Sequence, residues 1–257
     1  MEYTLNLILG GTELQLTGFI ALCAVSFFGS VIAASLGLGG GLLVIATMAL
    51  FLSPAVLIPV HGVVQLGSNL GRTALMVRHV LTPILPAFIA GTAIGAAIGG
   101  QLFVSLPTPA LQTVLALFVI YATWTPKFQA RTPGKKTFFA VGVVGAFVTM
   151  FVGATGPLVA PFAAAANKDR HGVVATHAML MTIQHSLKIV AFGFLGFAFW
   201  PYIPLLIGLL ACGFAGTWTG RHILNRLPEK VFRIGLKTIL TLLALRLLYD
   251  ALTALMA

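Results

Sequence analysis

The chain has 257 residues, of which 59% are hydrophobic and only 8% are charged, and its formal net charge at pH 7 is +10. So few charged residues exclude an ordinary soluble domain, in which about a quarter of the residues are charged. A net positive charge can indicate nucleic-acid binding, but in a membrane protein the basic residues mark cytoplasmic loops. We therefore expect a polytopic membrane protein whose partner is the lipid bilayer, and no nucleic acid.

Long stretches of the sequence carry no Lys, Arg, Asp or Glu. They cover residues 14–71, 79–126, 137–167 and 189–220. Each stretch is long enough for at least one helical crossing of about 20 residues. The first residues contain Glu2 and Glu13 and no basic residue, which argues against a cleaved secretory signal. We predict an all-α fold and a single transmembrane domain over residues 1–257.

About ten apolar segments are predicted in chain order, each near the length that a bilayer needs. The first half contains 14–36, 41–58, 60–77, 83–104 and 109–126, and the second contains 137–152, 156–167, 173–198, 201–221 and 231–255. Repeat 1 then covers about 14–126, a cytoplasmic linker 127–136, and repeat 2 about 137–257. Segments 41–58 and 156–167 are short, and each is read as a broken or re-entrant helix or as a full crossing.

Two glycine-rich stretches at matching places indicate an internal duplication. Residues 37–45 read GLGGGLLVI, and residues 153–161 read GATGPLVAP. When these stretches are superposed, His61 falls on His177, Asn69 on His185, and Arg72 on Lys188. At a slightly larger shift, the pattern GxxxGxxxxxxLP that begins at Gly95 falls on the one that begins at Gly216. Matches that keep their order along both halves favour a duplication over chance.

The basic residues predict the orientation of the two repeats. They gather at Arg72 and Arg78, at Lys127–Lys136, at Lys168 and Arg170, and at Arg221–Arg233. If every segment crosses the membrane, these clusters mostly flank loops on one face, as the positive-inside rule requires. Five segments per repeat is an odd number, so the repeats are inverted with respect to each other, and both termini face the exterior.

The third segment of each repeat carries a polar stripe. In HGVVQLGSNLGR the stripe is His61, Gln65, Ser68, Asn69 and Arg72, and in HAMLMTIQHSLK it is His177, Gln184, His185 and Lys188. These spacings place each set on one helical face. A polar stripe in an apolar segment faces a cavity or a neighbouring helix. The alternative to a functional site is that the amides and hydroxyls only join helices by hydrogen bonds.

The two cations of the stripes differ in their sequence surroundings. Arg72 lies near Arg78 and the cytoplasmic end of its segment, so it is either a site residue or a boundary residue that extends its side chain to the interface. Lys188 lies far from either end of its segment, and no Asp or Glu lies at comparable depth. A buried ammonium needs a counter-charge or water, so the missing partner of Lys188 is read as an anionic ligand.

The glycine-rich breaks suit the same ligand. A break at membrane depth allows a half-helix to begin there, with free N–H groups and the positive end of its dipole available to an anion. Pro157 directly after Gly156 is suited to a helix N-terminus because its missing N–H is not needed there. Close helix packing is the alternative role of a glycine, and it suits Gly91, Gly95 and Gly99 better because they recur every fourth residue.

The three histidines of the stripes admit three roles: hydrogen bonds between helices, proton carriage, or metal ligation. Metal sites usually add carboxylates or thiolates, and none is near, so we expect no metal and no cofactor. We expect no enzyme either, because Ser186 and His185 are adjacent on a helix and point about 100° apart.

With these residues in view, the chain resembles the TauE/SafE family of sulfite and organosulfonate exporters. The resemblance rests on GLGGGLLVIA and GATGPLVAPF, each followed by a polar helix, and it covers nearly the whole chain. It implies a secondary transporter, in the bacterial inner membrane, that exports small sulfur-containing anions such as sulfite, sulfonates or sulfoacetate. The second motif has ATGP where the first has LGGG, so the two half-sites need not share one substrate geometry.

We therefore expect a small anionic substrate to bind between the two repeats, while the oligomeric state stays open. A passive anion channel and a non-transporting membrane scaffold are the alternatives. The residues expected to bind the substrate are Gly39, Gly40, Gly41, His61, Gln65, Ser68, Asn69, Arg72, Thr155, Gly156, His177, Gln184, His185 and Lys188.

Overall fold

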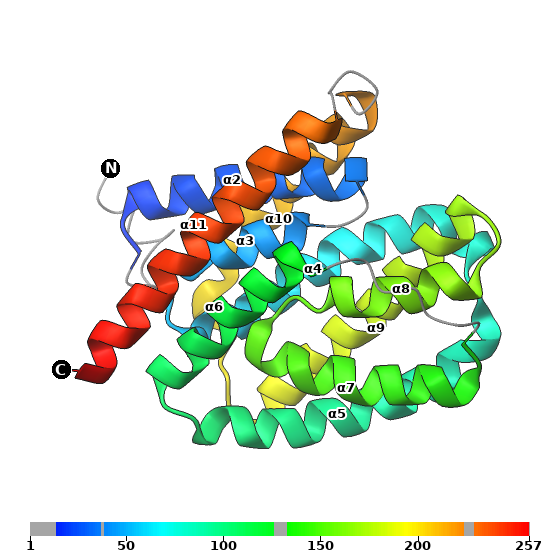
Figure 1. Ribbon diagram of the computed structural model, residues 1–257, viewed down its shortest axis with the longest axis horizontal. Coiled ribbons are helices and arrows are strands. Elements are labelled where there is room, and N and C mark those ends of the chain that lie inside the picture. Colours follow the sequence, from blue (N-terminus) through cyan, green and yellow to red (C-terminus); the bar gives the residue numbers. More distant parts are fainter. Residues whose placement is uncertain (1–13, 37–38, 126–132, 224–228, 257) are drawn as a thin grey trace.

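The computed structural model describes residues 14–36, 39–125, 133–223 and 229–256, and in these ranges every regular element is a helix (Figure 1). The first half contains α2 (Leu16–Leu36), α3 (Gly40–Met48), α4 (Pro54–Met76), α5 (Leu85–Ser105) and α6 (Thr108–Trp124). The second half contains α7 (Lys135–Val152), α8 (Gly156–Ala166), α9 (Arg170–Phe194), α10 (Ile203–Ile223) and α11 (Glu229–Met256). Short 3-10 turns lie at Val77–His79, Thr82–Ile84 and Trp200–Tyr202. The prediction of an all-α fold is confirmed for this part of the chain.

The predicted boundary at residues 58–60 is wrong. Helix α3 ends at Met48, and α4 begins at Pro54 and continues through Pro59. Pro54 suits the first turn of a helix because its missing N–H has no intrahelical partner there. Helix α9 likewise begins at Arg170, earlier than predicted, because the Asp169 side chain accepts a hydrogen bond from the backbone N–H of Gly172 and caps it.

The first short helix, α3, runs back along α2, the helix that precedes it. Gly29 of α2 faces Gly40 and Val44 of α3, whereas Gly18, nearer the start of α2, faces Phe51 just beyond α3. The chain therefore turns after α2 and returns toward the side from which α2 began. With 9 and 11 residues, α3 and α8 are about 14 and 17 Å long, which is less than the apolar thickness of a bilayer.

The main helix contacts pair one half of the chain with the other. Helix α5 packs against α7, α2 against α10, α4 against α9, and α6 against α11. Figure 1 shows α5 and α7 side by side along one edge of the molecule. The fourth helix of each half thus packs on the first helix of the other half, and the third and fifth helices pack on their own counterparts.

Glycines set the closest of these contacts, and they do so in the same way in both halves. A Cβ on Gly95 would overlap the carbonyl oxygen of Val143, and a Cβ on Gly216 would overlap that of Phe27. These two contacts join positions that the sequence superposition makes equivalent. The reciprocal packing supports the internal duplication, and the inverted orientation of the repeats in the membrane stays a prediction.

Five helices in the described ranges are long and apolar enough to cross a membrane. They lie within Leu16–Ala34, Thr82–Ser105, Lys135–Val152, Trp200–Gly220 and Ile234–Met256. Helices α4 and α9, with 23 and 25 residues, are also long enough at about 35 and 38 Å, but their polar stripes lower their hydropathy. Since α4 packs on α9, the stripes lie where the two halves meet.

Candidate functional site

The glycines at the start of α3 have three different roles. Gly39 has a φ of 96°, a left-handed conformation that favours glycine. Gly40 lies so close to α2 that a Cβ would overlap the carbonyl oxygen of Gly29, and Gly41 faces the amide of Gln65. The first intrahelical hydrogen bond runs from the N–H of Leu43 to the carbonyl of Gly39, so the N–H groups of residues 40–42 precede the helical ladder.

The second break is built differently. Helix α7 ends at Val152 and is capped by Gly153, whose φ of 71° again favours glycine, and α8 begins at Gly156. The N–H groups of Leu158 and Val159 both bond the carbonyl of Thr155, and Pro157 has no N–H. The first turn of α8 therefore leaves the N–H of Gly156 as its donor outside the ladder, fewer than the first turn of α3 provides.

A histidine on the third helix of each half holds the break of that half. His61 Nε2 donates to the carbonyl oxygen of Gly41 at 3.1 Å, and His177 Nε2 donates to that of Gly156 at 3.2 Å. The carbonyl can only accept, so the tautomer with hydrogen on Nε2 makes these bonds. The two histidines occupy equivalent positions and have equivalent partners. Of the three roles that the sequence left open, hydrogen bonding between helices is the one these two bonds show.

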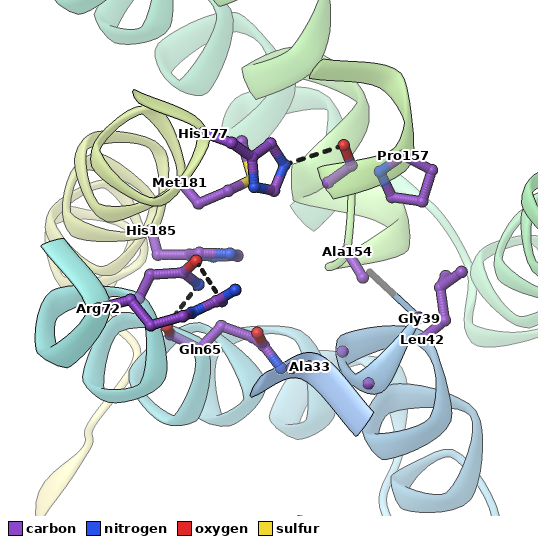
Figure 2. Close-up of a pocket in the computed structure, with 14 residues that line it drawn as sticks. Ala33, Gly39, Leu42, Gln65, Arg72, Ala154, Pro157, His177, Met181 and His185 are labelled. Carbon is purple, nitrogen blue, oxygen red and sulfur yellow. Dashed lines mark hydrogen bonds between the residues drawn. The ribbon is translucent and has the colours of Figure 1, made fainter. Parts of the chain in front are cut away.

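A cavity of about 50 Å³ lies where the two breaks approach each other. One wall is formed by the starts of α3 and α8, with Gly39, Gly40, Gly41, Leu42, Gly156 and Pro157, together with Ala33 and Ala154. The opposite wall is formed by α4 and α9, with Gln65, Asn69, Arg72, His177, Met181 and His185. Figure 2 shows the side chains of Arg72, His177 and His185 directed from α4 and α9 toward the glycine-rich wall.

Arg72 is held in the cavity wall by its own helix. One Nη2–H donates to Asn69 Oδ1 at 2.8 Å, and Nε–H donates to the carbonyl of Ser68 at 3.4 Å. Asn69 is itself fixed because its Nδ2 donates to the carbonyl of Gln65 at 2.8 Å. A guanidinium has five N–H donors, and these two bonds orient it while they leave other donors for a ligand.

Lys188, the equivalent of Arg72, does not line this cavity. Its side chain is completely buried, and its ammonium donates to the carbonyl oxygen of Gly153 at 3.1 Å. Gly153 lies at the C-terminal end of α7, where unpaired carbonyls and the negative end of the helix dipole favour a cation. The partner of Lys188 in the structure is thus a backbone carbonyl at a helix C-terminus. The prediction that Lys188 contacts the substrate remains untested.

Nine of the predicted substrate-binding residues line the cavity: Gly39, Gly40, Gly41, Gln65, Asn69, Arg72, Gly156, His177 and His185. The other five, His61, Ser68, Thr155, Gln184 and Lys188, are not among the residues that line it. Two of them bond each other, because the Thr155 hydroxyl donates to Gln184 Oε1 at 3.1 Å. The polar stripes therefore divide into residues that face the cavity and residues that support its walls.

Sequence reasoning missed five wall residues: Ala33, Leu42, Ala154, Pro157 and Met181. For Met181 a signal was present, because the superposition of the two glycine-rich stretches places it on Gln65. Its thioether is apolar, so the search for a polar stripe does not select it. The alanines could not be identified in this way, since alanine is common throughout the apolar segments.

The electrostatics of the cavity favour an anion. Arg72 lines it, helix α3 directs the positive end of its dipole into it, and none of its lining residues is Asp or Glu. In the described ranges the carboxylate of Asp169 caps α9, and that of Asp250 pairs with Arg246 at 3.0 Å. No group of three or more His, Cys, Asp or Glu residues that could hold a metal ion is present in those ranges.

Together, the apolar spanning helices and the central polar cavity define an integral membrane protein suited to hold a small anion. The family model described as "Sulfite exporter TauE/SafE" matches residues 22–247 of the 257. The chain therefore belongs to the TauE/SafE family, which is a family of membrane transporters, and the resemblance read from the sequence is confirmed. No curated protein and no solved structure matches the chain.

Proposed function

We propose that the chain is a secondary transporter that exports small sulfur-containing anions, such as sulfite, a short sulfonate or sulfoacetate. The substrate binds in the cavity between the starts of α3 and α8 and the polar faces of α4 and α9. The observation that carries this proposal is the composition of the cavity wall. One arginine and the start of a helix face a space that no carboxylate lines.

The size of the cavity limits the substrate. A space of about 50 Å³ corresponds to about three to five ordered water molecules at 10–15 Å³ each. A compact oxyanion with one central sulfur fits such a space better than a long organic sulfonate does. Sulfoacetate would need the walls to move apart, and the apolar side chains of Leu42, Pro157 and Met181 would then meet its carbon atoms.

We assign the main charge contact to Arg72 rather than to Lys188. Arg72 lines the cavity and its guanidinium is oriented by Asn69 and Ser68, whereas Lys188 bonds the carbonyl of Gly153 outside the lining. The N–H groups of residues 40–42 provide the second set of donors. A planar guanidinium and a row of backbone donors suit an oxyanion with several equivalent oxygen atoms.

A thermal-shift screen of the purified protein tests the proposal. Sulfite, methanesulfonate and sulfoacetate are compared with sulfate, phosphate and acetate. The first three are expected to raise the melting temperature the most, because a ligand that binds only the folded protein stabilises it. A screen in which acetate or phosphate stabilises best would contradict the substrate class.

Flux into liposomes then separates transport from its alternatives. A non-transporting scaffold gives no flux, and a passive anion channel gives flux that an imposed proton gradient does not reverse. A coupled carrier gives flux that the gradient reverses. The carrier is the expected result, because the residues that line the cavity come from both halves of the chain, so that a movement of one half against the other would change access to the site.

A further inference from the structure

His185 differs from the other two histidines of the polar stripes. His61 and His177 each donate to a backbone carbonyl, at 3.1 and 3.2 Å. His185 lines the cavity, its side chain is only 2% exposed, and its Nδ1 has no hydrogen-bond partner in the described part of the chain. The Nδ1 of His61 is buried without a partner as well, but His61 does not line the cavity. A buried polar atom without a partner is uncommon and costs free energy unless a ligand, water or a proton satisfies it.

The surroundings of His185 are cationic or neutral on every side. The charged or titratable groups near it are His61 and Arg72 on α4, and His177 and Lys188 on its own helix α9. The ring of His61 meets that of His185 edge-on, with 6.3 Å between the ring centroids. The starts of α3 and α8 present glycine, leucine and proline to the cavity and no titratable side chain.

From this arrangement we expect the binding of a proton and the binding of an anion to be cooperative. Without an anion in the cavity, protonation of His185 would add a third positive charge beside Arg72 and Lys188 in a site of low dielectric, with no carboxylate in the lining to offset it. An anion in the cavity supplies the missing negative charge. The effect is reciprocal, so a protonated His185 strengthens anion binding by the same factor.

We infer that His185 is a proton-binding site coupled to the anion site, so that each anion is carried together with one proton. This inference rests on the proposed function, because it requires an anion in the cavity. It also has an electrical consequence. A monovalent anion that crosses with one proton moves without net charge, whereas a divalent anion crosses with a net charge of −1 and is driven outward by an inside-negative potential.

The test uses methanesulfonate, the anion of a strong acid, as the probe. Its charge stays constant from about pH 5 to about pH 8, so any pH dependence in that range belongs to the protein. Binding to the purified full-length protein is measured by calorimetry across this range. We expect the affinity to rise as the pH falls, by up to about tenfold per pH unit where one proton is taken up per anion.

Three variants identify the residue responsible. His185→Gln, and His185→Asn, which introduces the residue found at the equivalent position 69, should bind methanesulfonate with an affinity that no longer depends on pH. His79→Gln alters an exposed histidine outside the cavity and should keep the parental dependence.

Proton uptake by the parent protein provides a measurement that needs no variant. Calorimetry in buffers of different ionisation enthalpy should report up to one proton bound per methanesulfonate. Binding without proton uptake and without pH dependence would overturn the coupling and leave the proposed function intact. A pH dependence that persists in both His185 variants would also overturn it. If no anion binds at any pH, the proposed function fails and the coupling fails with it.

Discussion

The two halves of the chain place a cation at the same position and use it differently. Arg72 on α4 lines the cavity and, among the described residues, bonds only its own helix, whereas Lys188 on α9 is completely buried and bonds the end of α7. His61 and His177, in contrast, have the same role, since each donates a hydrogen bond to a carbonyl at the start of a short helix. The repeated features thus build the frame of the site, and the features that differ between the halves determine its chemistry.

The starts of the two short helices differ in a related way. Helix α3 has three N–H groups ahead of its first intrahelical bond, and α8 has one, because Pro157 has no N–H and the N–H of Leu158 already bonds Thr155. Arg72, on the first half, lines the same cavity as the start of α3. The first half therefore contributes most of the donors for an anion, and the second half contributes His177 and His185. This division gives the halves separate roles that single substitutions can distinguish.

The largest expected effect concerns the orientation of the halves in the membrane. In a chain in which Cys23 and Cys212 are replaced by Ser, Ser105→Cys and Gly134→Cys place single thiols at two exposed helix ends. If the repeats are inverted and the basic loops face the cytoplasm, an impermeant reagent on intact cells labels residue 105 and leaves residue 134 unlabelled. Lysis of the cells, which exposes both, is the control. Labelling of residue 134 but not 105 on intact cells would reverse the orientation.

The second prediction concerns the cation that contacts the substrate. Arg72→Gln should weaken binding of the best anion in the screen by about 10- to 100-fold, because a charge-assisted hydrogen bond contributes about 1.5–3 kcal/mol. Arg72→Lys should recover part of the loss, since the charge remains but the planar fork does not. Arg246→Gln removes an exposed arginine that pairs with Asp250 and serves as the matched control. Unchanged binding by Arg72→Gln would remove Arg72 from the site.

The third prediction compares two glycines at equivalent positions. Gly40→Ala would place a methyl group on the carbonyl oxygen of Gly29, whereas the Cβ of Gly156→Ala would stay 3.6 Å from the nearest atoms, in the ring of His177. We expect Gly40→Ala to lower the free energy of unfolding by about 1–3 kcal/mol and Gly156→Ala to be nearly neutral. The melting temperatures of the two unliganded variants measure this difference. Equal melting temperatures would show that α3 and α2 can move apart without cost.

Much of the frame could be predicted from the sequence, because hydropathy and repetition both act over many residues. Helix α8 begins at Gly156 as expected, and the superposition that aligned the breaks also makes Pro54 equivalent to Arg170, the first residues of α4 and α9. The boundary near residue 58 was misplaced, since Pro59, which lies between the two predicted segments, is inside α4. A single proline within a helix is tolerated where neighbouring helices support the backbone.

The division of roles inside the site could not be predicted from the sequence. Lys188 drew attention because the sequence shows its distance from every carboxylate, but the sequence does not show that a backbone carbonyl lies within reach of its ammonium. The bond to Gly153 depends on the left-handed turn at the end of α7 and on the packing of α9 beside it. Such partners are set by tertiary structure, and the periodicity of a helix identifies only the face on which a residue lies.

The smallest expected effect on binding is that of Lys188→Gln, and it decides between the two cations. If Lys188 serves to fix the end of α7, the variant should bind the anion with an affinity within about threefold of the parent's. The ammonium of the parent lies outside the cavity lining, so its attraction for the anion is weakened by distance. The variant's melting temperature without ligand should fall, because the Gly153 carbonyl loses a charged donor while buried. The loss of a donor to a buried acceptor lowers the free energy of unfolding by about 1–3 kcal/mol. One thermal-shift titration measures both the affinity for the anion and the melting temperature without ligand.

The opposite result would exchange the roles of the two cations. Lys188→Gln with an unchanged melting temperature but no ligand-induced shift would make Lys188 the substrate contact, as the sequence alone suggested, and would assign Arg72 to the support of α4.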